Sequence, residues 1–485
     1  MRAVRLPWRA AVLGAVCGAV AGLATVPVNA GSDAMDHVDV PVPANQRMTL
    51  SNGLRLILVP RRDVPLIACS LTLRGGARLD PPGQAGTAAL AADLLTHGSG
   101  SRDAYAFADA VEGAGGSLAA EVHAEAIEVH GQFLARDSAL MLELLSDAVL
   151  RPRFDAGEFD KLRTRRIEEI KAAKDSSPQA LLGNYGRALL FGSHGYGKPV
   201  GGSEQSLARI RPADVRRLYA AQAGADHATL VIAGDFDAAQ IRAEVSRRFG
   251  VWPRAAAALP AIAETPRVTG RRVLLVDAPG STQTYFWLAN VGVSRHFPQR
   301  AALEIATSAF GGSFGSMLNQ ELRVKTGLTY GASARFARGS AAGEFAIGSF
   351  TETGNTARAI DLTLETLARV RRDGLDKATI DSARNYLLGQ YPLSFETSSD
   401  WAQALGELDL YGLPESEIGR FGSALMGVDV ASVQAVIAAT YPSPEDLDIV
   451  LIGDAARIGE VAARLGPVTQ TALAAPDFSA RTASP

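Results

Sequence analysis

Hydrophobic and polar positions along the chain alternate with two different periods. Apolar runs or an apolar–polar alternation predict strands over 54–60, 65–74, 117–133 and 228–235. A helical period predicts helices over 86–96, 103–114, 136–149 and 155–175, with one more that ends near residue 249. Strands and helices mixed in this way indicate an α+β fold.

The same order of elements recurs in the second half of the chain. Residues 273–276 follow the similar strand 56–59 by 217 positions, and Gly453-Asp454 follows Gly234-Asp235 by 219. Two motifs near opposite ends of each half thus share nearly one offset, which indicates internal duplication. We expect two homologous lobes, each a largely antiparallel sheet packed with helices, that form a clam-shell around a cleft.

The pattern also divides the chain into segments. Residues 1–9 carry three arginines, an apolar run covers 10–26, and Val28-Asn29-Ala30 fits the small-x-small cleavage rule. We therefore expect a signal peptide over 1–30, cleaved near Ala30, and export to the periplasm. The expected segments after it are a flexible leader over 31–46, an N-terminal lobe over 47–252, an Ala/Pro-rich linker over 253–268, a C-terminal lobe over 269–470 and a tail over 471–485.

Composition narrows the class of protein. The 485 residues are 47% hydrophobic and 20% charged, which excludes a disordered chain and a protein with many membrane spans. The net charge of −3 argues against nucleic acid or anionic lipid as the main partner. Cleavage of the signal peptide would leave Cys69 alone, in a strand pattern, where a buried and inert thiol is expected.

A short helical segment carries the first family resemblance. Residues 86–100 follow a strand and the turn Asp80-Pro-Pro-Gly83. This layout resembles the insulinase/pitrilysin (inverzincin) metallopeptidases, in particular the short processing-peptidase-like type. Active members have His-x-x-Glu-His here, in which two imidazoles hold zinc and the glutamate activates water. Ala89 and Asp93 take the two histidine positions and Ala92 the glutamate position, so the motif is degenerate.

The resemblance places the third zinc ligand of the family at Glu169, which we interpret as a remnant. An unusual metal set of Asp93, His97 and Glu169 is the alternative, while His97 can instead complement the dipole at a helix C-terminus. His123 and His130 are seven apart and would lie on opposite faces of one strand. We therefore expect no metal or other cofactor to be bound by this chain.

Residues 310–330 form the most specific stretch of the chain. Ser313 is expected to cap a helix over 314–325, Gly327 to end it in a left-handed conformation, and Leu328 to begin a strand. Arg323 then lies in the last helical turn and Tyr330 early in the strand, where both can donate to a peptide carbonyl or carboxylate. Alternatively, Arg323 compensates the helix dipole and Tyr330 packs in an interface.

This stretch resembles the C-terminal-lobe motif of the same family, whose arginine and tyrosine reach toward substrate at the zinc site. The resemblance implies that Arg323 and Tyr330 bind substrate and that no residue of this chain is catalytic. The loop His194–Gly202 also resembles a family loop and supports the fold.

The first hypothesis is a non-catalytic, substrate-binding subunit of an exported heteromeric zinc endopeptidase. Its partner subunit would carry His-x-x-Glu-His and the zinc, and its substrate would be a peptide or unfolded protein. The second hypothesis is a non-enzymatic peptide-binding or scaffold protein of the same fold. The third is a hydrolase with a non-standard metal site.

Overall fold

A six-stranded sheet organises each half of the chain in the computed structural model, which describes residues 39–479. The first sheet comprises β1(Gln46–Thr49), β2(Arg55–Pro60), β3(Leu66–Arg74), β4(Ser117–Val122), β5(Ala126–Leu134) and β6(Ala228–Gly234). The second comprises β7(Arg272–Asp277), β8(Gln283–Val291), β9(Ala332–Phe336), β10(Glu344–Glu352), β11(Asp448–Gly453) and β12(Val468–Ala472). The signal peptide predicted over 1–30 lies outside the described residues.

The two sheets repeat one topology. Their strand orders are β1-β2-β6-β3-β5-β4 and β12-β7-β11-β8-β10-β9, so β2, β6, β3, β5 and β4 correspond to β7, β11, β8, β10 and β9. The neighbours β2 and β6 are parallel, as are β7 and β11, and β12 is also parallel to β7. The other neighbouring pairs are antiparallel. The predicted duplication and the largely antiparallel sheets are confirmed.

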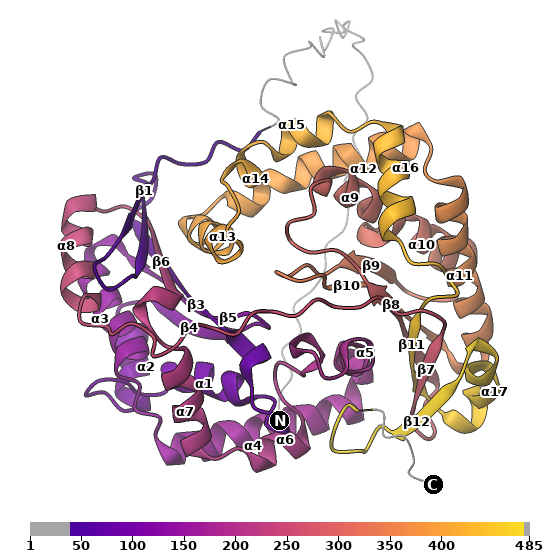
Figure 1. Ribbon diagram of the computed structural model, residues 1–485, viewed down its shortest axis with the longest axis horizontal. Coiled ribbons are helices and arrows are strands. Elements are labelled where there is room, and N and C mark those ends of the chain that lie inside the picture. The colour runs from indigo at the N-terminus through magenta and orange to yellow at the C-terminus, as the bar shows by residue number, and fades with distance from the viewer. Residues whose placement is uncertain (1–38, 480–485) are drawn as a thin grey trace, which may run out of the picture. The chain divides into compact units, whose positions relative to one another are not determined.

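Helices complete the two halves (Figure 1). The first half contains α1(Thr87–Leu95), α2(Ala104–Gly113), α3(Ser138–Leu150), α4(Ala156–Ser176), α5(Leu182–Phe191), α6(Glu204–Arg209), α7(Pro212–Gln222) and α8(Ala238–Phe249). The second contains α9(Arg300–Thr307), α10(Met317–Asn319), α11(Thr356–Asp373), α12(Lys377–Gln390), α13(Ser398–Tyr411), α14(Ser416–Gly419), α15(Phe421–Met426), α16(Val430–Thr440) and α17(Ala455–Leu465). Aspartates at helix starts explain several boundaries: Asp103, Asp155 and Asp237 each accept a hydrogen bond from the first turn.

Each sheet is covered on one face by a helix from the other half. Leu56 and Leu58 of β2 pack among helices of the first half, whereas Ile57 and Val59 pack against α13 with Trp401 and Leu405. A strand buried on both faces shows a continuous apolar run, which explains the sequence of β2. Reciprocally, α5 packs on the face of the second sheet formed by Leu274, Val276, Trp287, Val450 and Ile452 (Figure 1).

Segments outside the sheets also pack against the body. Residues 39–46 were expected to belong to a flexible leader, but Val40 is buried in the apolar cluster that includes Trp401 and Ile418, and Ser423 donates through its amide and hydroxyl groups to Asp39. In the segment expected as a tail, Phe478 is buried and makes an edge-on contact with Tyr185 of α5. Residues 39–46 contain two prolines and show neither a helical nor a strand period, so only the tertiary contacts reveal this packing.

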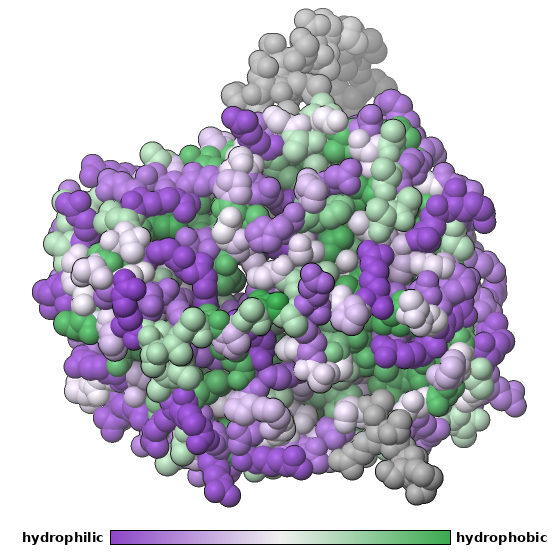
Figure 2. Space-filling model, viewed as in Figure 1, coloured by the Kyte–Doolittle hydropathy of each residue, from purple (hydrophilic) through white to green (hydrophobic). Residues whose placement is uncertain are grey.

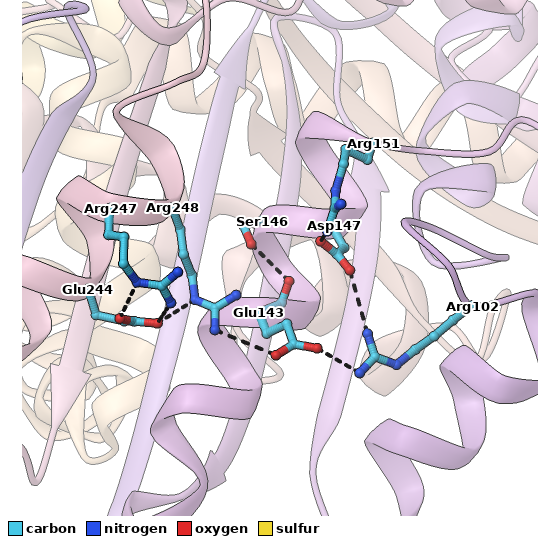
Figure 3. A network of polar contacts seen from close by, with 8 residues as sticks. All are labelled: Arg102, Glu143, Ser146, Asp147, Arg151, Glu244, Arg247 and Arg248. Atoms are coloured by element: carbon cyan, nitrogen blue, oxygen red, sulfur yellow. Dashed lines mark hydrogen bonds and ion pairs between the residues drawn. The ribbon is translucent and has the colours of Figure 1, made fainter.

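A network of ion pairs joins the helices on the outer side of the first sheet (Figure 3). Glu143 of α3 accepts from Arg102 at 2.7 Å and lies 3.5 Å from Arg248 of α8. Asp147, one turn later and buried, pairs with Arg151 and with Arg102. These contacts fix α3 against α8 and against the loop before α2.

The surface is mixed in character. On the face shown in Figure 2, hydrophilic residues are interspersed with small apolar groups. Within residues 39–479, no helix is both long enough and apolar enough to cross a membrane. Cys69 is buried as predicted, and this burial raises the pKa of its thiol to about 12.

Candidate functional site

Helix α1 begins where a buried carboxylate meets its first amides. The Asp80 carboxylate accepts hydrogen bonds from the backbone N–H of Gly86 at 2.7 Å and of Ala88 at 2.8 Å. Gly86 has a φ of 95°, a conformation that favours glycine, and places the chain at the start of the helix. Burial raises the pKa of Asp80 to about 7, although the two amides and the Lys198 ammonium act in the opposite direction.

Asp93, at one histidine position of the degenerate zinc motif, forms an ion pair with Arg166. Ala89 and Ala92 are fully buried in the core of the first lobe. The Asp93 carboxylate receives two hydrogen bonds from the Arg166 guanidinium of α4, from Nε at 2.6 Å and from Nη2 at 2.8 Å. This bidentate pair joins α1 to α4 and uses both oxygens of Asp93.

The other candidate metal ligands are also directed elsewhere. Glu169 lies 3.3 Å from Arg165 of its own helix and is largely exposed, so Arg166, one turn earlier, is the residue that faces α1. The Nδ1 atom of His97 lies 2.6 Å from the carbonyl oxygen of Asp93, next to the end of α1, as its helix-terminus interpretation predicted. Residues 39–479 contain no group of three His, Cys, Asp or Glu side chains arranged to hold a metal ion.

The two other histidines do not share one strand. β4 ends at Val122 and β5 begins at Ala126, so His123 lies in the hairpin turn and His130 on β5. The single strand assumed from the alternation of 117–133 is therefore wrong at this turn. His123 lines a cavity between the lobes, a role that periodicity did not indicate.

The 308–336 segment departs from the predicted helix and strand. It consists of two π-helical turns, η7(Ser308–Gly312) and η8(Gln320–Lys325), with α10 between them and β9 at its end. The predicted cap is wrong, because the Ser313 hydroxyl donates to the Ser308 carbonyl at 3.2 Å and the helical residues begin only after Ser316. The closely spaced glycines before Met317 disfavour a helix there.

A buried asparagine connects the two arms of this segment. The Asn319 side-chain amide donates to the Ser313 carbonyl at 3.1 Å, and its oxygen accepts from the backbone N–H of Ala332 at 2.9 Å. Gly327 has the predicted left-handed conformation, with a φ of 64°. The loop at 313–316 and the start of β9 are therefore held by the same side chain.

Tyr330 lies in an arch that is fixed at both ends. The Ser349 hydroxyl of β10 lies 3.2 Å from the Thr329 hydroxyl and donates to the Gly331 carbonyl at 2.9 Å. The strand starts at Ala332, later than predicted, and the Tyr330 side chain is 80% exposed. Tyr330 therefore does not pack in an interface of the described part of the chain.

Arg323 is stacked but otherwise unpaired. Its guanidinium carbon lies 4.4 Å from the ring centroid of Phe314, over the ring. Among residues 39–479, no side-chain hydrogen bond or ion pair engages its guanidinium. The neighbouring Glu321 carboxylate accepts instead from Lys325 at 3.0 Å and from Arg369 at 2.7 Å. The donors of Arg323 thus remain available to a ligand.

The predicted cleft is a cavity of about 870 Å³ between the lobes. The β4–β5 hairpin, the 337–344 loop and α13 all contribute to its lining. Glu125 joins the lobes there: Oε1 accepts from the Tyr196 hydroxyl at 2.5 Å and from the Ser340 amide at 2.8 Å, and Oε2 accepts from the Ser340 hydroxyl. Neither Arg323 nor Tyr330 lines this cavity, so both candidate substrate-binding residues lie outside it.

Comparison with known proteins assigns the chain to a family. The family model described as Insulinase (Peptidase family M16) matches residues 58–201, and that described as Peptidase M16 inactive domain matches residues 209–387. Together the two matches cover more than half of the chain. The chain belongs to the insulinase (M16) family. The chain lacks the His-x-x-Glu-His zinc motif, since positions 89, 92 and 93 hold two alanines and an aspartate.

Some relatives of this M16 chain are named as proteases, and another is named as a non-peptidase. An uncharacterized zinc protease of Mycobacterium leprae is 28% identical over 368 residues, which cover 76% of this chain and 82% of that protein. The non-peptidase homolog YmxG of Helicobacter pylori is 24% identical over 353 residues, which cover 72% and 81%. The crystal structure of a peptidase M16 inactive domain from Pseudomonas fluorescens matches with a TM-score of 0.79 and 23% identity over 85% of this chain and 98% of that one. This structural likeness establishes the fold.

Proposed function

We propose that this chain is the non-catalytic, substrate-binding subunit of an exported heteromeric zinc endopeptidase. One contrast carries the proposal. The zinc-motif positions are occupied by buried alanines and by the Asp93–Arg166 pair, whereas Arg323 and Tyr330 keep accessible donor groups. A chain that offers donors to a substrate but lacks the side chains of the zinc motif would depend on another subunit for the activated water.

The residues of this chain would act by binding and orienting substrate. The Arg323 guanidinium and the Tyr330 hydroxyl can each donate to a backbone carbonyl of an extended peptide. A donor that strengthens its hydrogen bond as the scissile carbonyl gains charge would favour the transition state. The partner subunit would supply the zinc, which activates the attacking water in peptidases of this kind.

Identification of the partner is the first test. We would purify the tagged mature chain from its native cell envelope and identify the proteins that come with it by mass spectrometry. We expect a near-stoichiometric protein with His-x-x-Glu-His. Recovery of the chain alone, or with unrelated envelope proteins, would contradict the heteromeric peptidase and favour a peptide-binding or scaffold role.

Kinetics of the purified complex then test the role of Arg323. A hydrogen bond from a charged donor is worth about 1.5–3 kcal/mol, so Arg323→Ala should lower kcat/KM by about tenfold to hundredfold without dissociating the complex. Arg335→Ala is the matched control, because Arg335 lies on β9 close in sequence, is largely exposed and is 3.9 Å from Glu344. Equal kcat/KM values for Arg323→Ala and the control would refute the substrate-binding role.

A further inference from the structure

Phe314 is a large apolar side chain in an unusual position. It is 68% exposed, although the chain buries most of its phenylalanines. One face of its ring carries the Arg323 guanidinium. The backbone next to it is fixed, because the Ser313 carbonyl accepts from both the Asn319 side chain and the Ser316 amide. The fixed backbone therefore holds the Phe314 ring at the surface, where it is largely exposed.

The stack limits the orientations of Arg323. A free surface arginine samples many rotamers, and ordering it on a ligand costs conformational entropy. A guanidinium that lies over an aromatic ring keeps its N–H groups at the rim of the stack, where they can meet an acceptor. Glu321, the acid nearest in sequence, is engaged by Lys325 and Arg369, so it does not draw Arg323 away.

We propose that Phe314 is a positioning residue for Arg323 and that the surface formed by Phe314 and Arg323 selects peptides with an apolar side chain next to a hydrogen-bond acceptor. The acceptor, a backbone carbonyl or a carboxylate, receives the N–H groups of Arg323. The apolar side chain covers the part of the Phe314 ring that the guanidinium leaves exposed. This inference rests on the proposed function only in that Arg323 contacts substrate.

Peptide binding to the full mature chain tests this selection. The probes are two short fluorescein-labelled peptides rich in alanine and glutamine, one with a central leucine and the other with serine at that place, and the readout is fluorescence anisotropy. We expect the wild-type chain to prefer the leucine peptide. Phe314→Ala should weaken binding of that peptide about tenfold and abolish the preference, whereas Phe314→Tyr should retain both affinity and preference.

A double-mutant cycle separates positioning from a general loss of structure. In the Arg323→Ala background, Phe314→Ala should weaken binding by only about twofold to threefold, because the guanidinium that it orients is gone. Tyr105→Ala is the matched control: Tyr105 is 81% exposed on α2 of the other lobe, and its removal should leave binding unchanged.

The inference is overturned if Phe314→Ala leaves both affinity and preference unchanged, if the two substitutions act additively, or if the wild-type chain binds neither peptide. These results are independent of whether a zinc-containing partner is found. A chain that shows the Phe314-dependent preference but has no peptidase partner would contradict the proposed function and leave the recognition surface intact.

Discussion

The Asp93–Arg166 pair is predicted to stabilise the fold by joining α1 to α4 at the zinc-motif positions. Both side chains are mostly buried, with 12% of Asp93 and 21% of Arg166 exposed, and they share two hydrogen bonds between α1 and α4. Asp93→Ala would leave the Arg166 guanidinium largely desolvated without an acceptor. Removal of one partner from such a pair is costly because the remaining charge keeps its desolvation penalty.

The expected magnitude follows from this burial. A fully buried pair that loses one partner costs about 3–5 kcal/mol, and the partial exposure of Arg166 reduces this to about 2–3 kcal/mol. The helices α5 and α13 each pack on the sheet of the other half, so we expect one cooperative unfolding transition of roughly 440 residues. For a unit of this size 1 kcal/mol corresponds to roughly 1 °C, and Asp93→Ala should lower Tm by about 2–3 °C.

A double-mutant cycle measured by thermal unfolding tests this reasoning. Asp93→Ala with Arg166→Ala should be about as stable as either single variant, which gives a coupling of about 2 kcal/mol. Arg165 and Glu169 offer a matched pair on the same α4, with 60% and 59% of their side chains exposed, and their coupling should stay below about 1 kcal/mol. Additive effects at Asp93 and Arg166, or equal couplings in the two cycles, would refute the structural role.

Two further predictions concern buried carboxylates. The stability of the wild-type chain relative to Asp80→Asn should fall as pH rises from about 4 to 7, at up to about 1.4 kcal/mol per pH unit. In this range the Asp80 carboxyl group keeps its proton in the folded state but has released it in the unfolded state, so a rise in pH favours unfolding. A difference in Tm that does not change between pH 5 and 8 would contradict this. Asp147→Asn should destabilise the chain by about 2–4 kcal/mol, because two arginines depend on this buried carboxylate. The matched substitution Asp373→Asn, at an exposed ion pair, should have a much smaller effect in the same unfolding measurement.

Much of the fold could be predicted because local patterns and tertiary structure agree. The apolar run of β2 reads as a strand buried on both faces, and the recurrence of Gly234-Asp235 at Gly453-Asp454 marks the same strand end in both lobes. No local pattern, however, says which helix covers which sheet. The placement of α13 on the first sheet depends on the packing of Trp401 against Ile57 and Val231, residues that lie far apart in the sequence.

The candidate site, too, could be predicted from the sequence only in part. The absence of the two histidines and the glutamate, whose positions are held by Ala89, Asp93 and Ala92, is readable from the sequence, since alanine has neither a lone pair for a metal nor a proton to transfer. The partner of Asp93 was not predicted, because the family resemblance points to Glu169 on this helix, whereas Arg166, one turn earlier, carries the complementary charge. An arginine on the helix facing a histidine-to-aspartate replacement is a signal that could have identified this pair.

The zinc-motif positions on α1 and the 308–336 segment differ in what they offer to a ligand. At the former zinc position each charge has a partner inside the fold, so the region contributes stability and offers little to a ligand. In the 308–336 segment the backbone is equally well bonded, but Phe314 and Tyr330 are exposed and the Arg323 guanidinium stacks on the Phe314 ring. Ordered backbone that presents unsatisfied donors and exposed rings is the arrangement that binding requires, since little conformational entropy remains to be lost. The first lobe thus holds an ion pair at the zinc-motif positions, whereas the exposed rings and the unpaired guanidinium lie on the second.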